Sequence, residues 1–422
     1  GVAPAFCTAS ADLQEAADEG PATHRRPPCA RCLRAAIMAV STEIACFSPR
    51  FELAENDVVV PNSPESPVPD SEAADHGLAM GQQEGRQCND QLPEFTLTDE
   101  MLDSLDKYGV PRELLADRVA KEAKALVLPM TGCGKPMSPQ VRDVALRFLS
   151  YFAQLLSLPQ KSWFEAVTLL DVAHSRMPEG IPPESLPATC VALVKMLRKA
   201  DAATLSMRGS NLAVHTKQLA QWLQRAGCPA QEATEEDLSK QECVLLEALE
   251  WQINLPSIES WMSMFCTRFN VLTRGLFVPS LNWVWEQGIF YARMVVMQRA
   301  TSKELPPRRQ AIGLLSLSFA SARLLELEAL RPHKLCSTMW EQLFVQSQLQ
   351  GSVPPCVLRP GHARRVLELL QVTMDTNLVD LQEDCERVAV LLRDALTTFR
   401  HMQQAQSGSQ AQTASQVHHT RV

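Results

Sequence analysis

The stretch KQECVLLEALEWQINLP, residues 240–256, has the pattern of an amphipathic helix that ends at a proline. At about 100° per residue, Leu245, Leu249 and Ile253 fall on one side of that helix and form an apolar stripe. Glu242 lies within roughly 60° of the stripe, so its carboxylate points the way the core-facing side chains point. The pattern therefore predicts a helix with a charge at its buried face, and that charge needs an explanation.

The rest of the composition favours helices over strands. Hydrophobic residues make up 45% of the 422 residues, Tyr occurs only 3 times, and Leu, Ala, Gln, Glu and Arg are frequent. These are helix-forming types, and the alternation that is typical of strands is almost absent. A chain of this length is enough for about two or three domains. We expect an all-α protein.

Charge and cysteine usage exclude several classes of protein. The net charge of −8 argues against general nucleic-acid binding, which needs a basic surface. No run of about 18 apolar residues is free of charges, so no membrane partner is expected. The 13 Cys form an odd set, and those after Cys88 mostly sit singly in apolar helical patterns, as reduced thiols do. We expect an intracellular protein, nuclear and/or cytoplasmic.

The N-terminal region, residues 1–95, is rich in Ala, Pro, Ser and acidic residues and lacks a periodic apolar face. Such a segment cannot offset the entropy of ordering, so we expect disorder. Ser-Pro pairs at Ser48, Ser63 and Ser66 are candidate sites for a proline-directed kinase, although such pairs also arise by chance in Pro-rich sequence.

Helical patterns bounded by Pro, Gly or polar capping residues begin after this region. After a lead-in element from about residue 98, they occur at 139–157, 161–175, 184–200, 211–226 and 235–253. They predict one helical domain over residues 96–256. A less regular series predicts a second helical domain over 257–400, and the polar residues 401–422 predict a disordered tail.

Motifs for metals, phosphates and catalysis are weak. The pair CARC at 29–32 has the spacing of half a zinc site, but no regular second pair follows. The segment TGCGKPMS at 131–138 lacks the first Gly of a phosphate-binding loop. The 9 His are scattered and none is paired at helical spacing. We expect no catalytic residues, no metal and no cofactor, and hence no enzyme.

Four of the helical segments resemble the cyclin box in their order and signature residues. They are VRDVALRFLSYFAQLLSL (141–158), WFEAVTLLDVAHSRM (163–177), ATCVALVKML (188–197) and SKQECVLLEALEWQINLPS (239–257). The resemblance implies two tandem five-helix cyclin folds, with a slight similarity to the D-type, G1 group. It also implies that Arg142 and Asp171 form a structural pair that fixes how two helices cross.

The resemblance further implies that Lys195 and Glu242 contact the regulatory helix of a cyclin-dependent kinase. A cation and an anion on neighbouring helix ends can hydrogen-bond a partner helix and set its register. From its helical position alone, Lys195 could equally be an ordinary solvated lysine. Substrates or inhibitors are further candidate partners.

Cell-cycle cyclins dock substrates on an apolar patch of the first helix. The matching candidate residues here are Val141, Val144, Ala145 and Phe148. The small Ala145 and the neighbouring Asp143 predict a shallower and more polar groove than the family usually has, with less apolar area for a peptide to bury.

These residues predict a cyclin that binds and activates a cyclin-dependent kinase in cell-cycle control. One alternative is a cyclin-fold adaptor or transcription-factor-like scaffold that activates no kinase. Another is a nucleic-acid-binding cyclin fold, which would need a basic face. The strongest basic stretches, KELPPRRQ at 303–310 and RPGHARR at 359–365, are short and lie near acidic residues.

Overall fold

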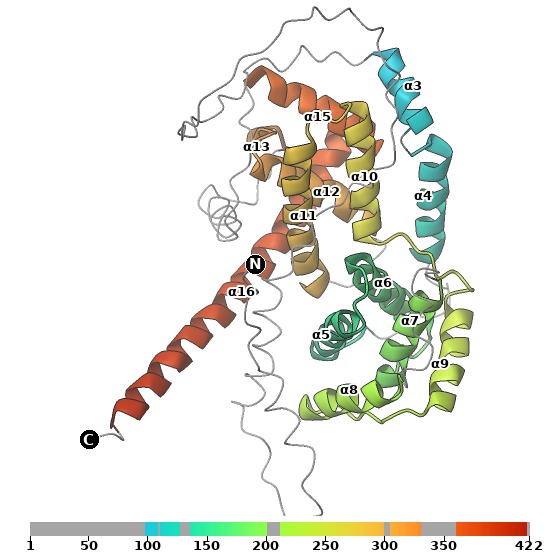
Figure 1. The fold of residues 1–422 in the computed structure, drawn as a ribbon, viewed down its shortest axis with the longest axis vertical. Coiled ribbons are helices and arrows are strands. Elements are labelled where there is room, and N and C mark those ends of the chain that lie inside the picture. Colours follow the sequence, from blue (N-terminus) through green and yellow to red (C-terminus); the bar gives the residue numbers. More distant parts are fainter. Residues whose placement is uncertain are drawn as a thin grey trace, which may run out of the picture. The chain divides into compact units, whose positions relative to one another are not determined.

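The computed structural model describes residues 98–108, 110–126, 136–200, 212–298, 304–330 and 360–419. Within these ranges every regular element is a helix (Figure 1), which confirms the all-α prediction. The region 1–95, with Ser48, Ser63 and Ser66, lies outside the described residues. None of the helices in the described ranges has both the length and the apolarity needed to cross a membrane.

The helices before residue 256 match the segments that the sequence predicts. Two lead-in helices are α3 (Asp99–Tyr108) and α4 (Arg112–Leu126). The first helical group follows: α5 (Pro139–Leu155), α6 (Gln160–Arg176), α7 (Leu186–Ala200), α8 (Val214–Arg225) and α9 (Glu235–Ala248). Helix α7 is the central element, since it packs against α5, α6, α8 and α9.

Local capping explains where several of these helices begin. The Ser138 hydroxyl accepts a hydrogen bond from the Val141 N–H at 3.3 Å, and Pro139 occupies the first turn of α5. Thr234 and Asp237 form a capping box at the start of α9. Both devices satisfy backbone N–H groups that have no partner inside the helix.

Helix α9 ends earlier than the sequence predicts. It stops at Ala248 because Glu250 and Trp251 take left-handed conformations, with φ of 50° and 60°. The Trp251 N–H then bonds back to the Leu246 carbonyl at 2.7 Å, which closes the helix end. Ile253 therefore lies beyond the helix and is not part of its apolar stripe.

The second helical group contains the remaining helices. They are α10 (Ile258–Leu272), α11 (Val278–Gln298), α12 (Pro307–Ser321), α13 (Leu327–Leu330), α15 (Pro360–Met374) and α16 (Leu378–His419). All residues of α12 from Gln310 to Ser321 are buried, and α10, α11 and α16 pack around it. A Cβ on Gly313 would lie 2.7 Å from the Asp384 carbonyl oxygen, so a glycine lets α12 and α16 approach closely.

The helix α16 continues into residues 401–422, for which the sequence predicts a disordered tail. This segment has no apolar stripe, but it is rich in Ala and Gln and contains no Pro. Ala and Gln are good helix formers, so backbone propensity favours a helix there even without a packed face.

Candidate functional site

Arg142 on α5 and Asp171 on α6 form a buried ion pair. The Arg142 Nε and Nη2 atoms donate to the two carboxylate oxygens of Asp171 at 3.0 Å and 2.9 Å. The side chains are only 7% and 4% exposed. Arg142 Nη1 also donates to the Val296 carbonyl on α11 at 2.7 Å. The structure thus brings together the two residues expected to form a structural pair, and it links them to the second helical group.

Lys195 on α7 and Glu242 on α9 lie in direct contact. The Lys195 Nζ atom is 2.7 Å from Glu242 Oε1, and the two side chains are 20% and 10% exposed. Lys199 Nζ lies 2.5 Å from the other oxygen, Oε2, and its side chain is 61% exposed. Glu235 adds a longer contact to Lys195 at 3.7 Å. We call these four residues the α7–α9 cluster.

The packing of α9 on α7 explains the position of Glu242. Leu238, Leu245 and Leu249 are fully buried on the face of α9 that packs against α7. Glu242 lies on that same face and is itself buried, so its carboxylate reaches the lysines of α7 rather than solvent. The Gln241 amide also donates to the Thr189 hydroxyl at 3.0 Å, which fixes α9 on α7.

Lys199 is a site residue that the sequence reasoning missed. It follows Lys195 by one helical turn, so the two lysines share a face of α7. That spacing is visible in the sequence, but the approach of Glu242 to both lysines depends on how α9 packs. The signal available in the sequence was the spacing of Lys195 and Lys199, which are four residues apart and so lie on one side of the helix.

The most exposed charge of the α7–α9 cluster is the ammonium of Lys199, and the cluster as a whole pairs two lysines with two glutamates. Each Glu242 oxygen lies within ion-pair distance of a lysine, so the carboxylate is neutralised within the chain. The exposed ammonium of Lys199 retains N–H donors for another group. A partner segment that offers carbonyl or carboxylate oxygens fits this arrangement, because charge-assisted hydrogen bonds are the stronger kind.

The residues expected to form a substrate-docking patch do not make an exposed surface. Val141, Ala145 and Phe148 are buried, and only Val144 is partly accessible. The Phe148 ring stacks on Phe152 with centroids 5.4 Å apart, and its edge packs on Trp222 of α8. Val141, Ala145 and Phe148 thus contribute to the core of the first helical group, and only Val144 of the four offers accessible apolar area.

The basic stretch at 303–310 is engaged within the protein. Arg308 donates to the carbonyls of Met374 and Asp375. Arg309 lies 2.6 Å from Asp384. In the second stretch, Arg364 pairs with Glu368 on the same helix. Arg308 and Arg309 thus face protein carbonyls and carboxylates, whereas Arg364 is 88% exposed.

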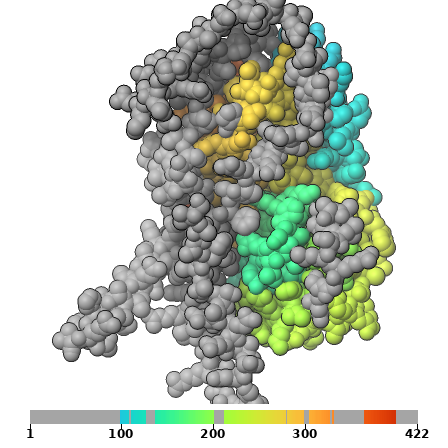
Figure 2. Space-filling view, viewed as in Figure 1, coloured from blue at the N-terminus to red at the C-terminus, as the bar shows by residue number. Residues whose placement is uncertain are grey.

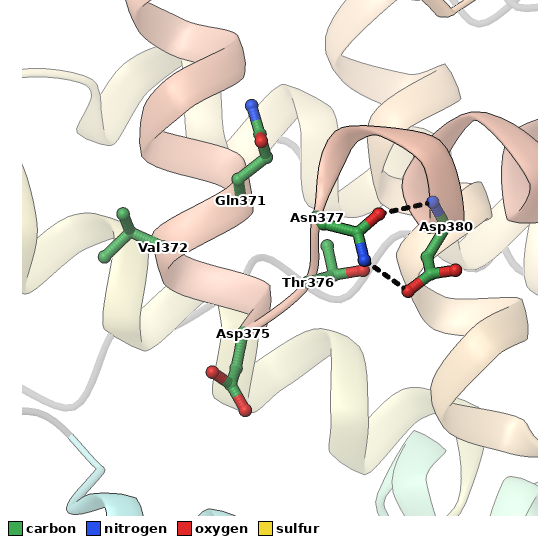
Figure 3. A pocket seen from close by; sticks show the side chains of 6 residues that line it. All are labelled: Gln371, Val372, Asp375, Thr376, Asn377 and Asp380. Carbon is green, nitrogen blue, oxygen red and sulfur yellow. Dashed lines mark hydrogen bonds between the residues drawn. The ribbon is translucent and has the colours of Figure 1, made fainter.

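A polar hollow lies at the turn between α15 and α16 (Figure 3). It is lined by Gln371, Val372, Asp375, Thr376, Asn377 and Asp380. Asn377 donates to the Asp380 carboxylate at 2.7 Å and accepts from the Asp380 N–H at 2.8 Å, which caps α16. These polar groups are used in ending one helix and starting the next.

The described residues contain no group of three or more His, Cys, Asp or Glu side chains placed to hold a metal ion. The CARC pair at 29–32 lies outside the described residues. No protein-family model matches the chain, and no curated protein matches it either.

Proposed function

We propose that this chain is a cyclin, a non-catalytic regulatory subunit that binds and activates a cyclin-dependent kinase in cell-cycle control. The observation that carries the proposal is the contact between Lys195 and Glu242 on neighbouring helices, at 2.7 Å and partly open to solvent. These are the two positions at which the sequence resembles the kinase-contacting pair of cyclins. The buried Arg142–Asp171 pair supports the same assignment.

We also propose that the two helical groups are tandem cyclin folds. The first would cover residues 96–256 and the second residues 257–400. The helix order α5 to α9 supports the first fold, since it follows the order of the segments that resemble the cyclin box. The central position of α7 in the first group and of α12 in the second supports a repeated plan.

The proposed mechanism is allosteric positioning. In protein kinases a Lys–Glu ion pair must be in place for phosphoryl transfer, and the position of a regulatory helix controls it. The α7–α9 cluster would hydrogen-bond the segment around that helix through its ammonium groups, and so hold the helix inward. Kinase substrates or inhibitors are additional proposed partners, and the proposed location is the nucleus and/or the cytoplasm.

A binding measurement with purified cyclin-dependent kinases tests this function. The double variant Lys195→Ala with Glu242→Ala is expected to lower kinase affinity at least about ten-fold, because a half-buried charged contact is removed. The matched control is Lys240→Ala with Glu236→Ala, an exposed ion pair on the same helix α9. The control removes the same two charges and is expected to bind normally.

Two outcomes contradict different parts of the proposal. Normal kinase binding by the Lys195→Ala and Glu242→Ala variant contradicts the site. Failure of the wild-type chain to bind any kinase of a full purified panel contradicts the function.

The second candidate function is a cyclin-fold adaptor that activates no kinase. It is favoured by the burial of Val141, Ala145 and Phe148, three of the four residues expected to dock substrates. A phosphorylation assay distinguishes the two functions. An adaptor would leave the activity of an added kinase unchanged, whereas a cyclin would raise it.

A further inference from the structure

Helix α4 contacts both helical groups. At its C-terminal end, Lys124 pairs with Glu250 at 3.1 Å, next to the end of α9. The Lys124 carbonyl also accepts a hydrogen bond from Arg176 of α6 at 3.2 Å. Nearer the N-terminal end of α4, Arg118 donates to the Ser260 carbonyl of α10 at 3.3 Å. Figure 2 shows the lead-in helices at the surface beside α10. These polar contacts add to the apolar packing of Leu115 and Ala125, which are buried on α4.

Glu122 is the most buried of these polar groups on α4. Its Oε1 atom accepts hydrogen bonds from the Trp261 indole N–H of α10 at 3.0 Å and from the Arg308 backbone N–H of α12 at 2.8 Å. The residue is only 6% exposed. A single carboxylate oxygen thus joins three helices that are far apart in the sequence.

The charge of Glu122 is poorly compensated. The Arg308 guanidinium donates to the carbonyls of Met374 and Asp375 on the far side of the junction. Burial raises the pKa of Glu122 from 4.5 to about 7, and the two N–H donors and the Arg308 charge lower it by less. Close to neutral pH, the docked carboxyl group therefore exchanges between its neutral and ionised forms.

We propose that Glu122 is a proton-dependent latch that holds α4 against α10 and α12, and that α4 docks more tightly when Glu122 takes up a proton. The geometry supports this directly. A neutral carboxylic acid keeps both accepted hydrogen bonds, while an ionised one must leave water for a site where the Arg308 charge does not offset the cost of burial. Exposure of α4 to solvent would let the carboxyl group ionise freely.

The direction of the pH effect follows from linkage. The pKa is about 7 when α4 is docked and returns to 4.5 when the group is exposed, so docking binds a proton. Docking is therefore strongest at acidic pH and weakens as the pH rises from about 5 to about 8. These two pKa values correspond to a docking constant that falls about 27-fold between about pH 5.5 and about pH 8.

Other charged groups lie on the helices packed around this junction. Arg118 is on α4 and Arg308 is on α12. On α10, Glu259 also has a pKa raised to about 7, by burial and then by the Glu165 charge, while Lys161 and Arg118 lower it. Titration of Glu259 would also make the docking of α4 depend on pH, so the experiment needs a variant at that position.

Hydrogen exchange with mass spectrometry on the full chain tests the latch. The readout is the protection of α4 peptides at pH 5.5 and pH 8, compared at each pH between wild type and Glu122→Gln. Glutamine keeps the oxygen that Trp261 and Arg308 use but cannot ionise. The ratio of variant to wild-type protection is expected to rise about 27-fold between the two pH values.

Two matched variants control this measurement. Glu113→Gln removes an exposed carboxylate from the first turn of the same helix and is expected to leave the wild-type pH dependence intact. Glu259→Gln is expected to retain it as well. An equal protection ratio at the two pH values overturns the latch, and so does a pH dependence that disappears in Glu259→Gln but persists in Glu122→Gln.

The wild-type protein decides the question even if Glu122→Gln fails to fold. Protection of α4, normalised to α7 peptides of the same sample, must then fall between pH 5.5 and pH 8. Unchanged normalised protection overturns the proposal. This test uses no kinase, so its outcome is independent of the proposed function.

Discussion

Two of the ion pairs in the first helical group differ greatly in character. Arg142 and Asp171 are both nearly inaccessible, and the planar guanidinium bonds both carboxylate oxygens and a carbonyl of another helix. Glu242 is buried, but Lys195 is partly exposed and a second, exposed lysine shares the same carboxylate. Both pairs join neighbouring helices of the first helical group. They differ in whether water can reach the cation.

That difference is the physical basis for proposing a structural role for the first pair and a binding role for the second. A buried charge is costly unless every partner is present, so the Arg142 pair tolerates no exchange of partners. A partly exposed lysine can turn from one acceptor to another with little loss, because water stabilises it during the change. Charge pairs of similar appearance in a sequence can thus have opposite uses.

The largest effect on folding is expected for Arg142→Ala. This change leaves the Asp171 carboxylate in the interior without its guanidinium and removes the donor to Val296. We expect the free energy of unfolding to fall by about 3–5 kcal/mol, measured by urea denaturation.

The control for Arg142→Ala is Lys121→Ala, which breaks an exposed pair with Asp117 on α4. It is expected to cost less than about 1 kcal/mol. A loss for Arg142→Ala as small as that of the control would contradict the structural role of the buried pair.

A smaller effect is expected for Glu242→Gln. The change removes the charge from the α7–α9 cluster but keeps the size and one acceptor oxygen, and both lysines can turn to water. We expect a loss of about 1–2 kcal/mol in the free energy of unfolding, shrinking as salt is added. Denaturation at low and high ionic strength measures both. A salt-independent loss equal to that of Arg142→Ala would show that the two pairs do not differ.

The smallest effect on folding is expected for Lys199→Ala. Its side chain is 61% exposed, so the ion pair with Glu242 is screened by water. We expect a change below about 1 kcal/mol in the free energy of unfolding, by the same denaturation assay. A larger loss would mean that Lys199 is structural and that the cluster resembles the buried pair after all.

Much of the first helical group could be predicted from the sequence because its helix starts are encoded locally. Ser138 with Pro139, and Thr234 with Asp237, are capping signals that act over a few residues. The direction of Glu242 toward the buried face of α9 also follows from helical periodicity alone.

Other features depend on contacts between distant residues and could not be predicted. The Phe148 ring packs against Trp222 of α8, and no local sequence pattern predicts that contact. The end of α9 is set by left-handed Glu250 and Trp251, where no glycine marks the position. The sharing of Glu242 by two lysines and the position of Glu122 likewise arise only after the helices have packed.

The hydrogen bond from Arg142 to the Val296 carbonyl has a consequence for the cooperativity of the molecule. One guanidinium serves α5 and α6 in the first helical group and α11 in the second. Unfolding of α11 would therefore remove the Val296 carbonyl from the buried Arg142 guanidinium. This loss couples the unfolding of α11 to the stability of the first helical group. We therefore expect the two helical groups on either side of residue 256 to unfold in overlapping calorimetric transitions.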